Sequence, residues 1–192
     1  MSPRDSADTR NRILQAAIAE FSAVGLAGAR VDRIAANAKA DKKLIYVYFH
    51  DKESLFSATL DRVLQDLIEA VPVDEKDLPG FAGRLFDYIH EHPEALRLSM
   101  WRQLERATLG PSNEAAYAAK VTAMESGDDT TRIDGVPPVD LLVLIQGMAG
   151  AWMQTPRDLL TADGSDPDSP ERIATHRRAL ITAVERLTRP TP

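Results

Sequence analysis

The chain has 192 residues, a formal net charge of −6 and no cysteine. This length can hold one large or two small domains with a real core, and a chain without cysteine has neither disulfides nor thiolate chemistry, which is typical of a reducing cytoplasm. The first residues contain no apolar stretch of the signal-peptide kind, and the longest aliphatic run near the C-terminal third covers only residues 141–145. We therefore expect a cytoplasmic protein without a membrane partner.

Charge is distributed unevenly along the chain. Residues 1–52 hold 9 Lys and Arg against 6 Asp and Glu, a net charge of +3, whereas residues 53–192 hold 14 against 23, a net charge of −9. A basic head on an acidic body is typical of a protein whose N-terminal end meets a polyanion. Taken alone, Lys39, Lys42 and Lys43 fit a merely solvated face equally well, as most short basic clusters do. The charge asymmetry favours the polyanion.

The first 52 residues predict three helices. The first covers about 9–24 and repeats apolar residues at helical spacing before Gly25 supplies a stop. The second is short and carries Ile34, Ala35 and Ala38 on one side. The third covers about 42–50. At about 100° per residue, its residues Leu44, Ile45, Tyr48 and Phe49 fall on one side and Lys42, Lys43, Tyr46, Val47 and His50 on the other.

Two tightly joined helices with facing apolar stripes predict a helix-turn-helix that binds DNA. Lys can meet phosphate or guanine acceptors and Tyr can touch a thymine methyl group, so the outward set suits a major groove. Asp41 and Asp51 stand directly before the third helix and the next one, where their side chains can accept the free N–H groups of the first turn. Lys39 lies in the connection, where a positive φ would favour glycine.

The remaining chain predicts further helices and no strand. A long helix over about 52–71 runs from the head into the body, and 72–80 is a loop. Helices are also expected at 81–91, 93–108, 112–124 and 139–154, and from a cap at Asp168 or Ser169 to about 188, with loops at 126–138 and 157–167. The expected fold is all-α: a three-helix head (1–52) joined by the long helix to a helical ligand-binding and dimerisation domain (53–192).

These motifs resemble the TetR family of bacterial transcriptional regulators over roughly residues 9–56. The resemblance rests on Ile34-Ala35-Ala36-Asn37-Ala38, Asp41-Lys42-Lys43 and Ile45-Tyr46-Val47-Tyr48-Phe49-His50-Asp51-Lys52-Glu53, with Phe21 and Gly25 upstream. It implies that Tyr46 contacts a base or methyl group, Tyr48 a phosphate and Lys52 the DNA backbone. For Tyr48, a place at the rim of the small core is an equal alternative. The predicted DNA-binding residues are Arg30, Arg33, Lys39, Lys42, Lys43, Tyr46, Val47, Tyr48, His50 and Lys52.

The last two long helices predict a homodimer. The helix at 139–154 is apolar on more than one side, which indicates burial by more than its own domain. In the resembled family the two helices form a four-helix dimer interface, and a helix-turn-helix needs a second copy to contact both half-sites. The alternative is that both helices are plain monomer core. The predicted interface residues are Leu141, Leu144, Ile145, Met148, Trp152, Ile173, Leu180, Ile181 and Val184.

The middle helices are expected to hold a small-molecule effector. By the family resemblance they surround a cavity, and their aromatic and soft side chains with polar tips suit an apolar pocket, in a segment expected to be farthest from the head and from the dimer helices. The same side chains fit plain core. The predicted effector-binding residues are Phe86, Tyr88, Met100, Trp101, Gln103 and Tyr117.

No motif in the sequence indicates catalysis or metal binding. Glycine-rich phosphate loops, nucleophile turns and His-Glu-x-x-His patterns are missing, and His90 and His92 lack the i, i+4 spacing that places two ligands on one helix face. We expect no cofactor and no enzymatic activity. The expected function is that of a sequence-specific regulator that binds double-stranded DNA, and the favoured form is a repressor that an effector releases from a palindromic operator. The alternative is an all-α ligand-binding or interaction dimer without specific DNA binding, because Val31 and Leu44 replace threonines common in the resembled family.

Overall fold

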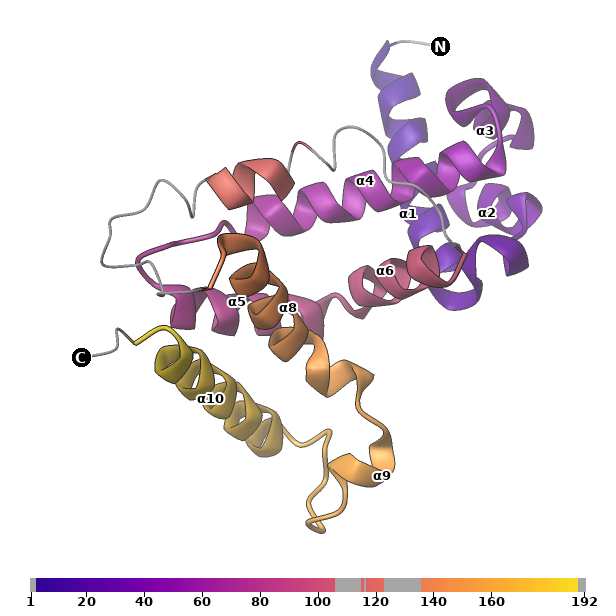
Figure 1. The fold of residues 1–192 in the computed structure, drawn as a ribbon. Coiled ribbons are helices and arrows are strands. Elements are labelled where there is room, and N and C mark those ends of the chain that lie inside the picture. Colours follow the sequence, from indigo (N-terminus) through magenta and orange to yellow (C-terminus); the bar gives the residue numbers. More distant parts are fainter. Residues whose placement is uncertain (1–2, 106–114, 116, 123–135, 190–192) are drawn as a thin grey trace. The chain divides into compact units, whose positions relative to one another are not determined.

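The computed structural model describes residues 3–105, 115, 117–122 and 136–189, and within these residues it contains helices and no strands (Figure 1). The predicted all-α class is therefore confirmed. The chain divides into two compact units: Met1–Leu67 with His92–Ala115, and Ile68–Glu91 with Ala116–Pro192. This division differs from the predicted boundary after residue 52, because a later helix returns to pack against the N-terminal one. The boundary at residue 52 stays a prediction about function.

The first unit contains α1 (Pro3–Gly28), α2 (Val31–Ala38), α3 (Lys42–Phe49), most of α4 (Lys52–Ala70) and α6 (Pro93–Glu105). Its core joins α1 to α4 through the rings of Phe21 and Phe56, whose centroids are 5.0 Å apart in an edge-to-face arrangement. Ile34 of α2 and Ile45 of α3 are fully buried in the same cluster. The core therefore fixes α2 and α3 against a rigid base.

The corner between α1 and α2 depends on Gly25. This residue has φ 69° and ψ −177°, so the predicted helix stop is present as a break, after which one more helical turn follows to Gly28. The residue packs so closely that a Cβ there would lie 2.7 Å from the ring of Trp101 and 2.7 Å from the Glu105 carboxylate. Only glycine meets both demands.

The second unit contains α5 (Leu78–Glu91), α8 (Pro138–Gln154), the short α9 (Arg157–Leu160) and α10 (Pro170–Leu187). Helix α5 packs against both α8 and α10 (Figure 1). An ion pair of 2.7 Å between Arg177 of α10 and Asp87 of α5 joins two of these helices. Residues 115 and 117–122 are also helical, as predicted, and the predicted loop at 126–138 lies largely outside the described residues.

In the second unit, the sequence signals predict the start of α10 correctly but miss a short helix within residues 157–167. The hydroxyl of Ser169 accepts a hydrogen bond from the N–H of Arg172, so the predicted N-cap of α10 is confirmed. The segment 157–167 was expected to be loop throughout, but Arg157–Leu160 forms α9. Pro156 directly precedes that turn and accepts its first backbone hydrogen bonds from Leu159 and Leu160.

Five of the nine predicted dimer residues belong to the core of their own chain. Leu141, Ile145, Trp152, Leu180 and Val184 are already buried within the single chain, and their contact with a partner copy stays a prediction. Helix α8 is instead exposed on its opposite side, where Val139, Val143 and Leu144 are 52%, 61% and 46% exposed. Met148, Ile173 and Ile181 are half-buried. The amphipathic pattern of an apolar helix could not show which apolar side faces its own domain.

Candidate nucleic-acid interface

Helix α3 divides into the two faces that its sequence predicts. Ile45 and Phe49 are buried, Leu44 and Tyr48 are half-buried, and Lys42, Lys43, Tyr46, Val47 and His50 are exposed. Tyr46 is 44% exposed and Val47 67%. Large apolar side chains held outward beside two lysines have the chemistry for thymine methyl groups and for phosphate or guanine oxygens.

One aspartate caps the N-terminus of α3, and another caps the N-terminus of α4. Oδ1 of Asp41 accepts from the backbone N–H of Lys43 at 2.8 Å, and Oδ1 of Asp51 accepts from that of Ser54 at 2.6 Å. The hydroxyl and backbone N–H of Ser54 hold the pKa of Asp51 below its ordinary value. Both predicted caps are confirmed, and they fix where α3 and α4 begin.

The turn between α2 and α3 places Lys39 in the left-handed region, with φ 51° and ψ 44°. The N–H of Ala40 donates to the carbonyl of Ala35 and that of Lys39 to Ala36, the pattern of a Schellman motif. The positive φ considered from the sequence is thus present, occupied by lysine where glycine is usual. Its side chain is exposed at the end of α2.

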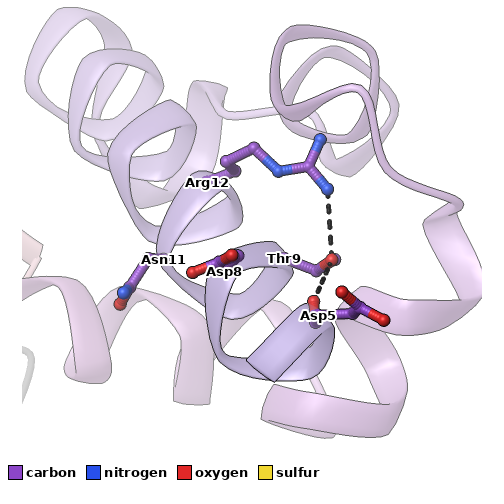
Figure 2. Close-up of a pocket in the computed structure, with 5 residues that line it drawn as sticks. All are labelled: Asp5, Asp8, Thr9, Asn11 and Arg12. Carbon is purple, nitrogen blue, oxygen red and sulfur yellow. Dashed lines mark hydrogen bonds between the residues drawn. The ribbon is translucent and has the colours of Figure 1, made fainter. Parts of the chain in front are cut away.

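Arg12 of α1 supports this turn from behind, a role the sequence did not reveal. Its Nη1 donates to the carbonyl oxygens of Ala38 and Lys39 at 3.1 and 3.3 Å, and its Nη2 donates to Oγ1 of Thr9 at 3.1 Å. A guanidinium at the C-terminus of α2 satisfies free carbonyls and opposes the negative end of the helix dipole. Figure 2 shows the link from Arg12 through Thr9 to the backbone of Asp5.

The same residues line an open hollow of about 610 Å³ on α1. Its lining is Asp5, Asp8, Thr9, Asn11 and Arg12 (Figure 2). Two carboxylates and an arginine already bonded to carbonyl oxygens do not suit a phosphate, so we do not assign this hollow to DNA.

His50 connects α3 to α4 through a strained turn. Its φ is 68° and ψ −56°, and the N–H of Asp51 donates to the carbonyl of Phe49 at 2.8 Å, which makes a γ-turn of the rare positive-φ form. Lys52 follows and its Nζ donates to the carbonyl of Ala29 at 3.4 Å. The backbone of this turn therefore fixes the positions of two side chains at the connection between α3 and α4. These are the exposed imidazole of His50 and the ammonium group of Lys52.

Arg33 is exposed on α2 and takes part in an ion pair, and its role as a DNA-binding residue stays a prediction. Its guanidinium meets the carboxylate of Glu20 at 2.7 Å, and the backbone N–H of Arg30 donates to the same carboxylate at 2.8 Å. Burial opposes ionisation of Glu20, but these partners outweigh burial and lower its pKa. Arg33 therefore links α2 to α1 through Glu20, and the side chain of Arg30 is exposed as well.

Tyr48 occupies the position at the core rim that the sequence left open. It is half-buried, its ring packs edge-to-face with Phe49, and its hydroxyl lies 3.0 Å from Oγ of Ser6 in α1. This contact ties the N-terminal turns of α1 to α3. The phosphate contact of Tyr48 stays a prediction.

The predicted effector residues are spread over both units. Trp101 packs on the core of the first unit and its Nε1 donates to the carbonyl of Ser22, while Met100 and Gln103 are exposed on the same helix. Phe86 is buried in the second unit with its ring 5.6 Å from that of His176 in α10, and Tyr88 and Tyr117 are half-buried. The expectation that this segment lies farthest from the head and the last helices is wrong for Trp101 and Phe86.

No group of three or more His, Cys, Asp or Glu residues within the described ranges could hold a metal ion. Those ranges also contain no helix with the length and hydropathy for crossing a membrane.

An outward basic helix, capped and buttressed behind a tight turn, defines a helix-turn-helix DNA-binding regulator. Two family descriptions match the chain: "Bacterial regulatory proteins, tetR family" over residues 13–59, and "Tetracyclin repressor-like, C-terminal domain" over residues 77–186. The chain belongs to the tetR family of bacterial transcriptional regulators, and the resemblance inferred from its motifs is confirmed.

The similar proteins described next match this chain over most of its length. The HTH-type transcriptional repressor SCO4008 of Streptomyces coelicolor is 44% identical over 162 residues, which make up 82% of this chain and 84% of that protein. The structure of SCO4942 from Streptomyces coelicolor is 39% identical and superposes with a TM-score of 0.79, covering 93% of this chain and 97% of the other. A TetR family regulator from Marinobacter aquaeolei VT8 is 25% identical, with a TM-score of 0.71 over 95% and 98% of the two chains.

Proposed function

We propose that this protein is a cytoplasmic homodimeric repressor that binds a palindromic operator and is released by a small-molecule effector. The observation that carries the proposal is the outward face of α3, with Lys42, Lys43, Tyr46 and Val47 exposed on a helix whose other side is core. The repressor SCO4008, at 44% identity, supports repression as the direction of control.

The homodimer is supported by the exposed side of α8. Val139, Val143 and Leu144 lie outward there, and Gly147 has open space where a side chain would stand. A flat apolar stripe around a glycine allows another helix to approach closely. A two-fold pair would place two copies of α3 about one turn of DNA apart, ~34–36 Å, and so link dimerisation to operator symmetry.

Control by an effector requires two states of the dimer with different DNA affinity. We place the effector in the second unit, where α5, α8 and α10 pack together. Helix α4 is continuous from Lys52 to Ala70 and carries the chain from the first unit into the second, so an effector that prefers one arrangement of the second unit can change the spacing of the two heads. DNA affinity then falls by the ratio of effector affinities for the two states.

Selection of duplexes from a random library tests the DNA-binding part. The expected result is a palindrome whose half-sites are about one helical turn apart, with binding lost when one half-site is scrambled. A dimer that enriches no sequence would instead favour an interaction or ligand-binding dimer without specific DNA binding.

Tryptophan emission tests the effector part. Trp152 is buried in the second unit beside His176, with ring centroids 4.5 Å apart, so the Trp101→Phe variant carries a reporter for that unit alone. A panel of apolar and aromatic small molecules should include one that changes Trp152 emission and releases the selected duplex at the same concentration. Emission changes without release, across all active compounds, would contradict coupling.

A further inference from the structure

Lys42, the first residue of α3, is paired with an acid from the neighbouring helix. Its Nζ lies 2.7 Å from Oδ1 of Asp32 in the first turn of α2. The two side chains are 46% and 63% exposed, so the ion pair lies on the outer surface of the helix-turn-helix. The hydrogen bond with Lys42 lowers the pKa of Asp32, and the same bond raises the pKa of Lys42.

The side chains around this pair are among those expected to meet DNA. Arg30 stands close enough to lower the pKa of Asp32 as well, and Tyr46 follows Lys42 by one helical turn on the same face of α3. A carboxylate at this place repels phosphate. It also occupies the lysine that would otherwise be the natural phosphate partner at the start of α3.

We propose that Asp32 is a specificity-determining residue, which pairs with Lys42 to suppress sequence-independent DNA binding. This inference rests on the DNA-binding function. Non-specific affinity comes from lysine and arginine replacing counterions on phosphates, and a lysine already neutralised by a carboxylate replaces fewer. An ammonium group has three donors, so Lys42 can keep Asp32 on one and offer the others to guanine O6 and N7 at a matching base pair. The pair therefore weakens binding to random DNA more than binding to the operator.

The Asp32→Asn variant frees Lys42 while keeping the size of the side chain. Binding is measured against salt concentration with two duplexes: one selected from a random library by the wild-type protein, and a scrambled duplex of the same length and composition. For the scrambled duplex we expect affinity to rise roughly three- to tenfold at low salt and the salt slope to steepen by about one unit. The selected duplex gains less, so the ratio of the two affinities falls.

Asp8→Asn is the matched control, because Asp8 is an exposed aspartate of α1 in the same head. The change in net charge is identical, and the scrambled duplex should gain little. A second comparison repeats Asp32→Asn in a Lys42→Gln background, where the steeper slope should disappear because the lysine is gone.

Equal gains for Asp8→Asn and Asp32→Asn, or an undiminished gain without Lys42, would show that Asp32 acts only through bulk charge and would overturn the proposal. Circular dichroism and thermal melting confirm that each variant is folded, and Asp32→Ser replaces Asp32→Asn if the amide disturbs α2. A wild-type protein that selects no sequence would contradict the operator function, whereas the scrambled-duplex slopes would still test the pair.

Discussion

The indole Nε1 of Trp101 donates a hydrogen bond of 3.2 Å to the carbonyl oxygen of Ser22. In an unbroken helix that carbonyl would accept from the N–H of Leu26, but α1 is interrupted at Gly25 and the N–H of Leu26 donates to Glu105 at 2.9 Å instead. The break at Gly25 therefore leaves the carbonyl of Ser22 and the N–H of Leu26 without each other as partners. Helix α6 supplies a donor, Trp101, to the carbonyl and an acceptor, Glu105, to the N–H.

We expect Trp101→Phe to destabilise the first unit by about 1–2 kcal/mol, because the ring is kept while a half-buried carbonyl loses its donor. Thermal or urea unfolding followed by circular dichroism measures the loss. Leu104→Ala is the control on the same helix: Leu104 is 71% exposed, so its removal should change stability little. Equal losses in the two variants would mean that the hydrogen bond does not fasten α6.

Gly25→Ala should cost more, about 2–4 kcal/mol, because a Cβ adds a clash to a positive φ. The Cβ would lie 2.7 Å from both the Trp101 ring and the Glu105 carboxylate. Combining Gly25→Ala with Trp101→Ala removes the ring but not the backbone strain. The double variant should therefore be more stable than the sum of the two single losses, and strict additivity would show that the ring is not the obstacle.

We expect Lys43 to act mainly through its charge and Tyr46 mainly through recognition of the base sequence. Lys43→Ala is expected to weaken binding to every duplex and to reduce the salt slope by about one unit, whereas Tyr46→Ala should lower discrimination at one base pair by ~1–3 kcal/mol. Titrations of selected and scrambled duplexes at several salt concentrations distinguish the two. If both variants lost affinity for both duplexes in the same proportion, this division of roles would be incorrect.

The proposed dimer predicts opposite behaviour for two adjacent residues of α8. Leu144→Asp places a charge on the exposed side and should leave a folded monomer of 21.1 kDa in sedimentation. Ile145→Ala should instead keep the dimer but lose about 2–5 kcal/mol of stability, because Ile145 is fully buried in its own chain. Leu159→Asp, on an exposed leucine of α9, is the control for the charge itself. A Leu144→Asp protein that stays dimeric would remove this face from the interface.

Acid should loosen α2 from α1 through Glu20. Its lowered pKa means that its ion pair with Arg33 contributes to stability above the ordinary carboxyl value of 4.5 and that this contribution is lost as pH falls through the lower, folded value. Glu20→Gln should therefore cost about 1 kcal/mol at neutral pH, since Arg33 is half exposed, and should flatten the fall in stability below pH 4.5. Parallel pH profiles for the two proteins would contradict the assignment.

Local sequence signals were sufficient for the head. The cap residues Asp41 and Asp51, the buried residues Ile34 and Ile45 and the outward residues of α3 all follow from spacing within a few residues, because helix geometry alone decides them. The helical class and most helix limits follow in the same way.

Long-range contacts were not accessible from the sequence. The ion pair of Arg33 with Glu20, thirteen residues earlier, is not indicated by any local pattern, and neither is the hydrogen bond from Trp101 to Ser22 of α1. Nothing near Arg12 or Glu105 in the chain indicates that their partners are backbone groups of other helices. The apolar pattern of α8 likewise identified a helix that is apolar on more than one side, but it could not show which of these residues its own domain buries.

Lys39 and His50 are the two non-glycine residues with positive φ in the described part of the chain, and both are exposed on the helix-turn-helix. Glycine at either position would relax the backbone by about 1 kcal/mol and would remove a side chain that we propose contacts DNA. Under the proposed contacts, stability and DNA recognition favour different residues at these two backbone positions, so a thermostable version of this head would have to be improved elsewhere.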